Sequence, residues 1–139
     1  MKILVLEDDV QLRMAFRDAL EDAGHSVTAV GSIEDAHERL ERRDLDLLLL
    51  DLDIDGQCAL PIADLARYAI PNAEVIIVTG SRAYPWGELH ARAHNVSWSI
   101  RKPVALSDLL NVIDFTEHRR LKRSQLASCP NPFGGDRIC

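Results

Sequence analysis

Residues 47–56, "LLLLDLDIDG", run four leucines directly into three aspartates that are spaced two residues apart. A continuous apolar run is typical of a strand that is buried on both faces of a parallel sheet. Asp51 then stands just beyond the carboxyl end of this strand, where open α/β sheets place their ligand sites. The segment therefore predicts a central strand that ends in a polar site.

Strand-like and helix-like patterns alternate on both sides of this segment. Short aliphatic or β-branched runs indicate strands, and apolar residues at helical spacing behind Asp9, Ser32 or Pro61 indicate helices. This alternation predicts an α/β fold of three layers, a doubly wound five-stranded parallel sheet with helices on both faces. Strands are expected at 2–6, 26–30, 45–50, 74–78 and 96–100, and helices at 10–23, 33–43, 61–69, 85–94 and from 107 to at least 118.

The composition excludes several classes of protein. The chain has 139 residues, 47% of them hydrophobic, which is enough for one domain with a sizeable core. Its net charge of −6 argues against nucleic-acid binding, because the phosphate backbone favours basic surfaces. No apolar run approaches the ~20 residues that span a membrane. Three scattered cysteines without a CxxC motif are typical of a reduced, cytoplasmic protein.

The end of the chain differs in composition from the rest. Residues 124–139 are rich in Ser, Pro and Gly, so we expect one domain at 1–120 and a flexible C-terminal extension at 121–139. No output domain is expected. The basic run from Arg119 to Arg123 is interpreted as a helix C-terminus that complements the helix dipole.

Two known acidic motifs match the aspartates incompletely. A calcium-binding EF-hand begins D-x-D-x-D-G, but its twelfth position, which needs a bidentate glutamate, is Ile62. The aspartyl-phosphatase (haloacid dehalogenase) motif also places D-x-D after a strand, and Thr79 and Lys102 fit its later motifs. That family, however, carries its nucleophile on the first strand and its acidic metal pair last in the chain.

A third interpretation uses polar side chains that follow four separate strands. In a doubly wound sheet the carboxyl ends of these strands converge. Carboxylates can hold Mg²⁺ and accept a phosphoryl group, while a hydroxyl and an ammonium can hold phosphoryl oxygens. The residues are Glu7, Asp8 and Asp9 after the first strand, Asp51 after the third, Thr79 after the fourth and Lys102 after the fifth.

The motifs "VLEDD", "LLLLD", "VTG" and "RKP", in this order, resemble the receiver domain of two-component response regulators. The resemblance covers about residues 1–118 and implies a flavodoxin-like, CheY-like fold with Mg²⁺ as cofactor. Asp8 and Asp51 would bind the metal directly. Asp53 would contribute its backbone carbonyl, and Glu7 would act through water.

The same resemblance assigns the phosphoryl chemistry. Asp51 would be the phosphoacceptor, Thr79 would donate a hydrogen bond to the phosphoryl group, and Lys102 would pair with it. The resemblance also implies a cis peptide bond between Lys102 and Pro103. Only about 5–6% of X–Pro bonds in folded proteins are cis.

Some residues depart from the family pattern, and others would modulate the site. Asp55, interpreted as a turn residue, stands where many receivers have proline, and the segment looks like a set of stand-alone receivers common in alphaproteobacteria. Ser99 stands at the usual aromatic switch position. Gly80 gives the loop after the fourth strand backbone freedom, and Arg82 is expected to pair with Asp53 over the mouth of the site.

Without an output domain, the signal would leave through a surface formed by residues 85–94, 96–100 and the last helix. Receivers commonly use this region for partners or homodimers, and Trp is enriched in interface hot spots. The alternative is that the tryptophans fill the core. The residues proposed for this surface are Trp86, His90, Trp98 and Ser99.

The sequence therefore predicts a stand-alone, phosphorylatable receiver of a phosphorelay. Asp51 would accept a phosphoryl group from a histidine kinase or a histidine phosphotransfer protein and switch a surface for an unknown downstream protein. Beyond limited self-phosphorylation and autodephosphorylation, no enzymatic activity is expected. Two alternatives stay open: a phosphate sink without downstream contact, and a small aspartyl phosphatase.

Overall fold

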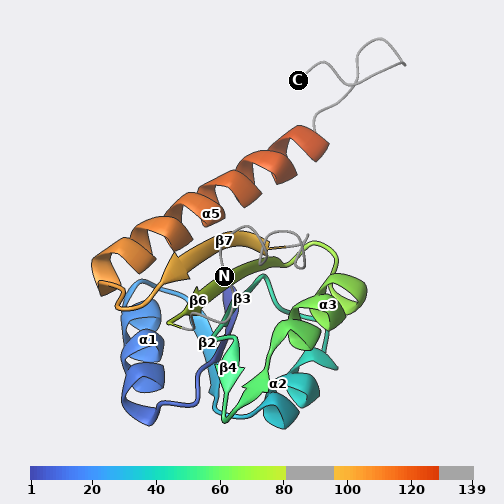
Figure 1. The fold of residues 1–139 in the computed structure, drawn as a ribbon. Helices are drawn as coiled ribbons and strands as arrows, with labels where there is room; N and C mark the ends of the chain where they lie inside the picture. Colours follow the sequence, from blue (N-terminus) through green and yellow to red (C-terminus); the bar gives the residue numbers. More distant parts are fainter. Residues whose placement is uncertain (81–95, 129–139) are drawn as a thin grey trace.

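The computed structural model describes residues 1–80 and 96–128, and its centre is a five-stranded parallel sheet (Figure 1). The strand order β2-β1-β3-β6-β7 confirms the predicted doubly wound sheet. The helix expected at 85–94 lies outside the described residues. The strands are β1 (Lys2–Leu6), β2 (Ser26–Val30), β3 (Leu47–Leu50), β6 (Glu74–Thr79) and β7 (Val96–Arg101), and the helices are α1 (Val10–Asp22), α2 (Ile33–Leu40), α3 (Leu60–Ala69) and α5 (Leu106–Ser128).

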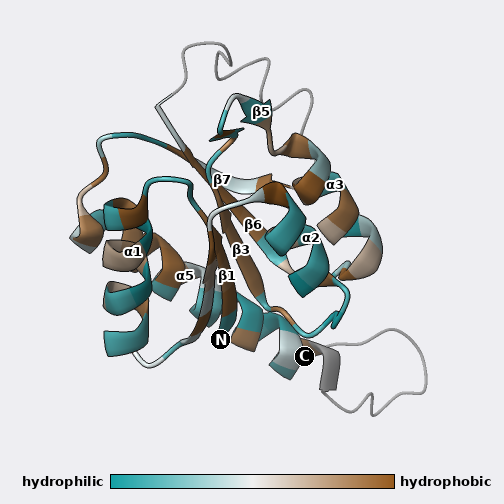
Figure 2. Ribbon diagram, turned by 90° about the horizontal axis from the view of Figure 1, so that it is seen from below, coloured by the Kyte–Doolittle hydropathy of each residue, from teal (hydrophilic) through white to brown (hydrophobic). Residues whose placement is uncertain are grey.

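Alternate side chains of the strands face opposite sides of the sheet and meet different helices. Leu4 and Leu6 of β1 pack with α2 and α3, while Ile3 and Val5 pack with α1 and α5. All four leucines of β3 are buried, as expected for a strand covered on both faces. Figure 2 shows the apolar strands between two layers of helices. The predicted three-layer fold is therefore confirmed.

Side-chain caps begin two helices where the sequence indicated them. The Asp9 side chain accepts hydrogen bonds from two backbone N–H groups in the first turn of α1, and Ser32 accepts one at the start of α2. Gly24, with φ of 95°, follows the end of α1, in the left-handed conformation that glycine adopts without strain. The Asp9 cap fixes the direction in which the chain leaves the acidic end of β1.

A short hairpin follows β3 and was not predicted. Strand β4 (Asp53–Ile54) pairs in antiparallel fashion with β5 (Gln57–Cys58). Asp55 and Gly56 form the connection and have φ of 50° and 79°. Asp-Gly is a preferred pair for two-residue hairpin loops that need positive φ. The interpretation of Asp55 as a turn residue is confirmed.

Helix α5 crosses the boundary that the sequence placed at residue 120 and runs past the end of the sheet (Figure 1). Residues 121–128 belong to this helix, which continues to Ser128, and the division into a domain and an extension stays a prediction. The basic run is also not a helix C-terminus: Arg119 and Arg123 each bind the buried carboxylate of Glu74. These ion pairs hold the second half of α5 against the start of β6. No helix within 1–80 and 96–128 is long and apolar enough to cross a membrane.

Candidate functional site

The carboxyl ends of β1, β3 and β6 meet the segment after β7 around a hollow of about 380 Å³. Each of these strands contributes at least one polar side chain, as the sequence predicted. The hollow therefore confirms that residues far apart in the chain converge at one edge of the sheet. It is lined by Glu7, Asp8, Asp9, Asp51, Asp53, Thr79, Gly80 and Lys102.

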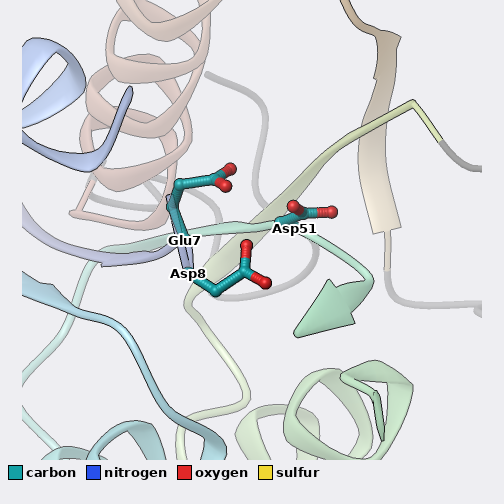
Figure 3. Close-up of side chains that lie close together, drawn as sticks. All are labelled: Glu7, Asp8 and Asp51. Carbon is teal, nitrogen blue, oxygen red and sulfur yellow. The ribbon is translucent and has the colours of Figure 1, made fainter. Parts of the chain in front are cut away.

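Three carboxylates face one common space in this hollow (Figure 3). One oxygen from each of Glu7, Asp8 and Asp51 lies within 4.8 Å of the others. Glu7 is 2% exposed and Asp51 is 7% exposed. Carboxylates this close repel one another unless a cation lies between them. An all-oxygen donor set with few carboxylates is the kind of site that Mg²⁺ prefers, so these residues fit that ion.

The ammonium of Lys102 supplies positive charge to this cluster. Its Nζ donates hydrogen bonds to Glu7 Oε2 at 2.7 Å and to Asp51 Oδ2 at 2.9 Å. Burial alone would lower the pKa of Lys102, but the hydrogen bonds to the two carboxylates outweigh it and raise the pKa above its ordinary value. Lys102 therefore stays charged beside the predicted phosphoacceptor.

The pKa of Glu7 is shifted mainly by burial, because Glu7 is the most deeply buried of the three acids. Burial raises its pKa to about 7, although the hydrogen bond from Lys102 opposes this shift. The Asp51 carboxylate adds to the increase. The backbone N–H of Glu7 donates to Val30 O at 3.1 Å, so β2 fixes the position of Glu7.

The β4–β5 hairpin orients Asp8. The backbone N–H of Asp55 donates to Asp8 Oδ2 at 3.0 Å, and this hydrogen bond holds the pKa of Asp8 below its ordinary value. The backbone N–H of Asp53 donates to Asp51 Oδ1 at 3.2 Å. The hairpin thus supplies one donor to each aspartate. Sequence reasoning identified Asp55 as a turn residue but missed this role of the hairpin.

Arg13 and Gly31 are a second pair that sequence reasoning missed. Arg13 Nη1 donates to the backbone oxygen of Glu7 at 3.0 Å, so a guanidinium from α1 holds the loop that carries Glu7 and Asp8. A β-carbon built on Gly31 would overlap the same Nη1 atom. Gly31 therefore leaves the space through which Arg13 reaches the loop.

Thr79 and Lys102 lie side by side at the ends of neighbouring strands. The Lys102 backbone N–H donates to Thr79 O at 3.2 Å, and Thr79 is 7% exposed. A β-carbon on Gly80 would lie 3.6 Å from the Lys102 β-carbon, so the chain packs closely here. The predicted cis peptide bond between Lys102 and Pro103 is confirmed.

Trp86 and His90 of the predicted output surface lie outside the described residues, as does Arg82, which was expected to pair with Asp53. Trp98 is half-buried and packs in the α1–α5 core layer, with its ring edge-to-face on Phe115 at 5.8 Å between centroids. Trp98 therefore packs against the core, and its part in an output surface stays a prediction. Ser99 is the next residue in β7 and points to the opposite face of the sheet.

The fold and the acidic hollow together define a doubly wound α/β protein with a site suited to a divalent cation and a phosphoryl group. The family "Response regulator receiver domain" matches residues 3–114. The "Response regulator receiver protein CpdR" of Brucella abortus is 31% identical over 113 residues, which are 81% of this chain and 93% of that protein. The chain belongs to the response regulator receiver domain family.

Other relatives agree with this assignment. The "Swarming motility regulation protein RssB" of Serratia marcescens is 33% identical over 86% of this chain, which spans 54% of that longer protein. A CheY-like receiver domain from Methanospirillum hungatei has a TM-score of 0.79 at 22% identity, over 88% of this chain and 97% of its own. A receiver protein from Sinorhizobium medicae has a TM-score of 0.76 at 25% identity, over 86% and 96%.

Proposed function

We propose that Asp51 accepts a phosphoryl group from a partner histidine kinase or histidine phosphotransfer protein in the cytoplasm. The observation that carries this proposal is the position of Asp51 at the end of β3, hydrogen-bonded to Lys102 at 2.9 Å and beside Asp8 and Glu7. A buried carboxylate paired with an ammonium group can act as a nucleophile toward phosphorus. Membership of a two-component signalling family supports this role over that of a small aspartyl phosphatase.

The metal would be held by Asp8, Asp51 and the backbone carbonyl of Asp53, with Glu7 acting through water. When bound, Mg²⁺ neutralises charge on the transferring phosphoryl group. A carboxylate oxygen of Asp51 attacks phosphorus, the bond to the donor's histidine nitrogen breaks, and the imidazole leaves with the electron pair. Thr79 and Lys102 then hold the phosphoryl oxygens.

One contact supports a role of Lys102 in the transfer, and one solved structure supports the role of the metal. Its ammonium already reaches the Asp51 carboxylate, so a short movement would bring it to a phosphoryl oxygen. A solved receiver from Thermotoga maritima, described as "in complex with Mg(2+)-BeF", has a TM-score of 0.72 at 21% identity over 83% of this chain and 97% of its own. That protein's complex with Mg(2+)-BeF supports the proposal that the acidic hollow of this chain binds Mg²⁺.

The output of the switch is part of the same proposal. Residues 85–94, β7 and α5 would carry the signal to a downstream protein or a second copy of the chain, and Phe115 is 54% exposed on α5. A phosphate sink needs no such contact. If amide hydrogen exchange at this surface stays the same when Asp51 is phosphorylated, the phosphate-sink alternative is favoured.

The test is intact-protein mass spectrometry after incubation with acetyl phosphate and Mg²⁺. We expect the parent to gain one phosphoryl group and Asp51→Asn to gain none. The matched control is Asp55→Asn, which makes the same charge change on the neighbouring hairpin and keeps the backbone donor to Asp8. Equal labelling of Asp51→Asn and the parent contradicts the proposal.

A further inference from the structure

A second polar groove lies at the opposite end of the sheet from the acidic hollow. Its volume is about 560 Å³, within the range of about 300–1,000 Å³ that is typical of small-molecule sites. Glu74 and Thr79 are the two ends of β6, and a six-residue strand places them about 16 Å apart. We call this the basic groove, and its polar lining is Arg67, Asn72, Glu74, Arg120, Arg123 and Ser124.

The two walls of the basic groove come from different helices. Arg67 lies in the last turn of α3, and Arg120, Arg123 and Ser124 belong to the part of α5 that continues beyond residue 118. The loop from Pro71 to Ala73 and the start of β6 lie between them. The continuation of α5 therefore builds one wall of this groove.

The ion pairs around the groove leave positive charge unbalanced. Glu74 accepts from Arg119, Arg123 and the Ser97 hydroxyl, so one carboxylate is shared by two guanidinium groups. Arg120 binds Asp46 Oδ1 at 3.2 Å. The groove lining itself holds three arginines, Arg67, Arg120 and Arg123, and one carboxylate, Glu74, in a chain whose net charge is −6.

Contacts within the protein orient the guanidinium groups of Arg119, Arg120 and Arg123 before any ligand arrives, although the Arg123 side chain is 64% exposed. Glu74 is 7% exposed, and its oxygens at 3.1 and 3.2 Å orient Arg119 and Arg123. Arg120 also donates to the backbone oxygen of Asn72. Fixed planar guanidinium groups bind phosphate oxygens well, because less side-chain freedom is lost on binding.

We propose that the basic groove binds a small ligand that carries a pyrophosphate group, of the nucleoside di- or triphosphate class. Arg67 on α3 and Arg123 on α5 line the groove from different helices, so a ligand with two linked anionic groups can contact both. The volume exceeds what a single phosphate needs. This site is separate from the phosphorylation site and does not depend on it.

The test is isothermal titration calorimetry of the full chain with phosphate, pyrophosphate and ATP. The buffer is freed of metal by resin rather than by EDTA, because EDTA is itself a polyanion. We expect pyrophosphate and ATP to bind and phosphate to bind at least several-fold more weakly. The double variant Arg67→Gln, Arg123→Gln should lose roughly tenfold or more in affinity, since it removes two charge-assisted contacts.

The matched control is Arg17→Gln, Arg42→Gln, which removes two surface arginines outside the groove and should keep the parent's affinity. Circular dichroism checks that all variants fold. Equal losses in both double variants, or pyrophosphate no tighter than phosphate, would overturn the proposal. A peptide of glutamates that binds more tightly than ATP would also overturn it, in favour of an acidic protein partner. Asp51→Asn should bind normally, and a changed affinity would place the probe in the acidic hollow instead.

Discussion

Replacing Lys102 with methionine tests how the acidic hollow is held together without metal. The ammonium bridges Glu7 and Asp51, whose side chains are 2% and 8% exposed. Breaking a fully buried ion pair costs about 3–5 kcal/mol, because a buried charge loses its partner. Lys102 itself is 23% exposed, so we expect a smaller loss, about 2–3 kcal/mol in free energy of unfolding near pH 8.

The loss of stability in Lys102→Met should be larger near pH 8 than near pH 5.5. The pKa of Glu7 in the folded protein is raised to about 7, above its ordinary value of 4.5. The folded state therefore holds this proton more tightly than the unfolded chain, and Glu7 costs stability as the pH rises from 4.5 to 7. Without Lys102 the pKa of Glu7 rises further. Near pH 5.5 the variant's Glu7 is protonated and the loss should fall to about 1 kcal/mol.

The assay is urea unfolding followed by circular dichroism at both pH values in metal-free buffer. Lys122→Met is the control, because Lys122 is exposed on α5 and its loss should change stability by less than about 0.5 kcal/mol. Added Mg²⁺ should restore part of the stability of Lys102→Met. A loss that is the same at both pH values, or no larger than that of the control, refutes the reasoning.

Two further predictions concern residues near the hollow. Gly31→Ala and Arg13→Gln should each weaken Mg²⁺ binding several-fold in a fluorescence or calorimetric titration. Because both changes remove the same hydrogen bond to Glu7, the double variant should bind Mg²⁺ as tightly as either single variant. Additive losses of affinity would contradict this. If the side chains of Asp53 and Arg82 pair over the site, Asp53→Ala and Arg82→Ala should change the dephosphorylation rate non-additively. Strictly additive effects in a phosphate-release assay would show that the two side chains do not interact.

The strand ends of the site could be predicted because they depend on local patterns. The four leucines before Asp51 required a buried strand, and the order of strands in an alternating α/β chain brings Asp8, Asp51, Thr79 and Lys102 to one edge. These predictions needed no knowledge of side-chain packing. The convergence seen in the hollow follows from topology alone.

The remaining features depend on contacts between residues that are distant in sequence. The Asp55 N–H reaches Asp8 across 47 positions, and the space that Gly31 leaves for Arg13 appears once β2 and α1 are placed together. The composition after residue 120 indicated a flexible segment, but ion pairs to Glu74, which lies 45 and 49 positions away, hold α5 in place. No local pattern carries this information.

The central claim is that Asp51 carries the phosphoryl group as an acyl phosphate. The most direct measurement is borohydride reduction of the protein after incubation with acetyl phosphate and Mg²⁺, followed by peptide mass spectrometry, because borohydride converts an aspartyl phosphate to homoserine. The account predicts homoserine at position 51, dependent on Mg²⁺ and absent from a sample without acetyl phosphate. Homoserine at position 8 or 53 with none at 51, or phosphate that resists borohydride on a serine, threonine or histidine, would contradict it.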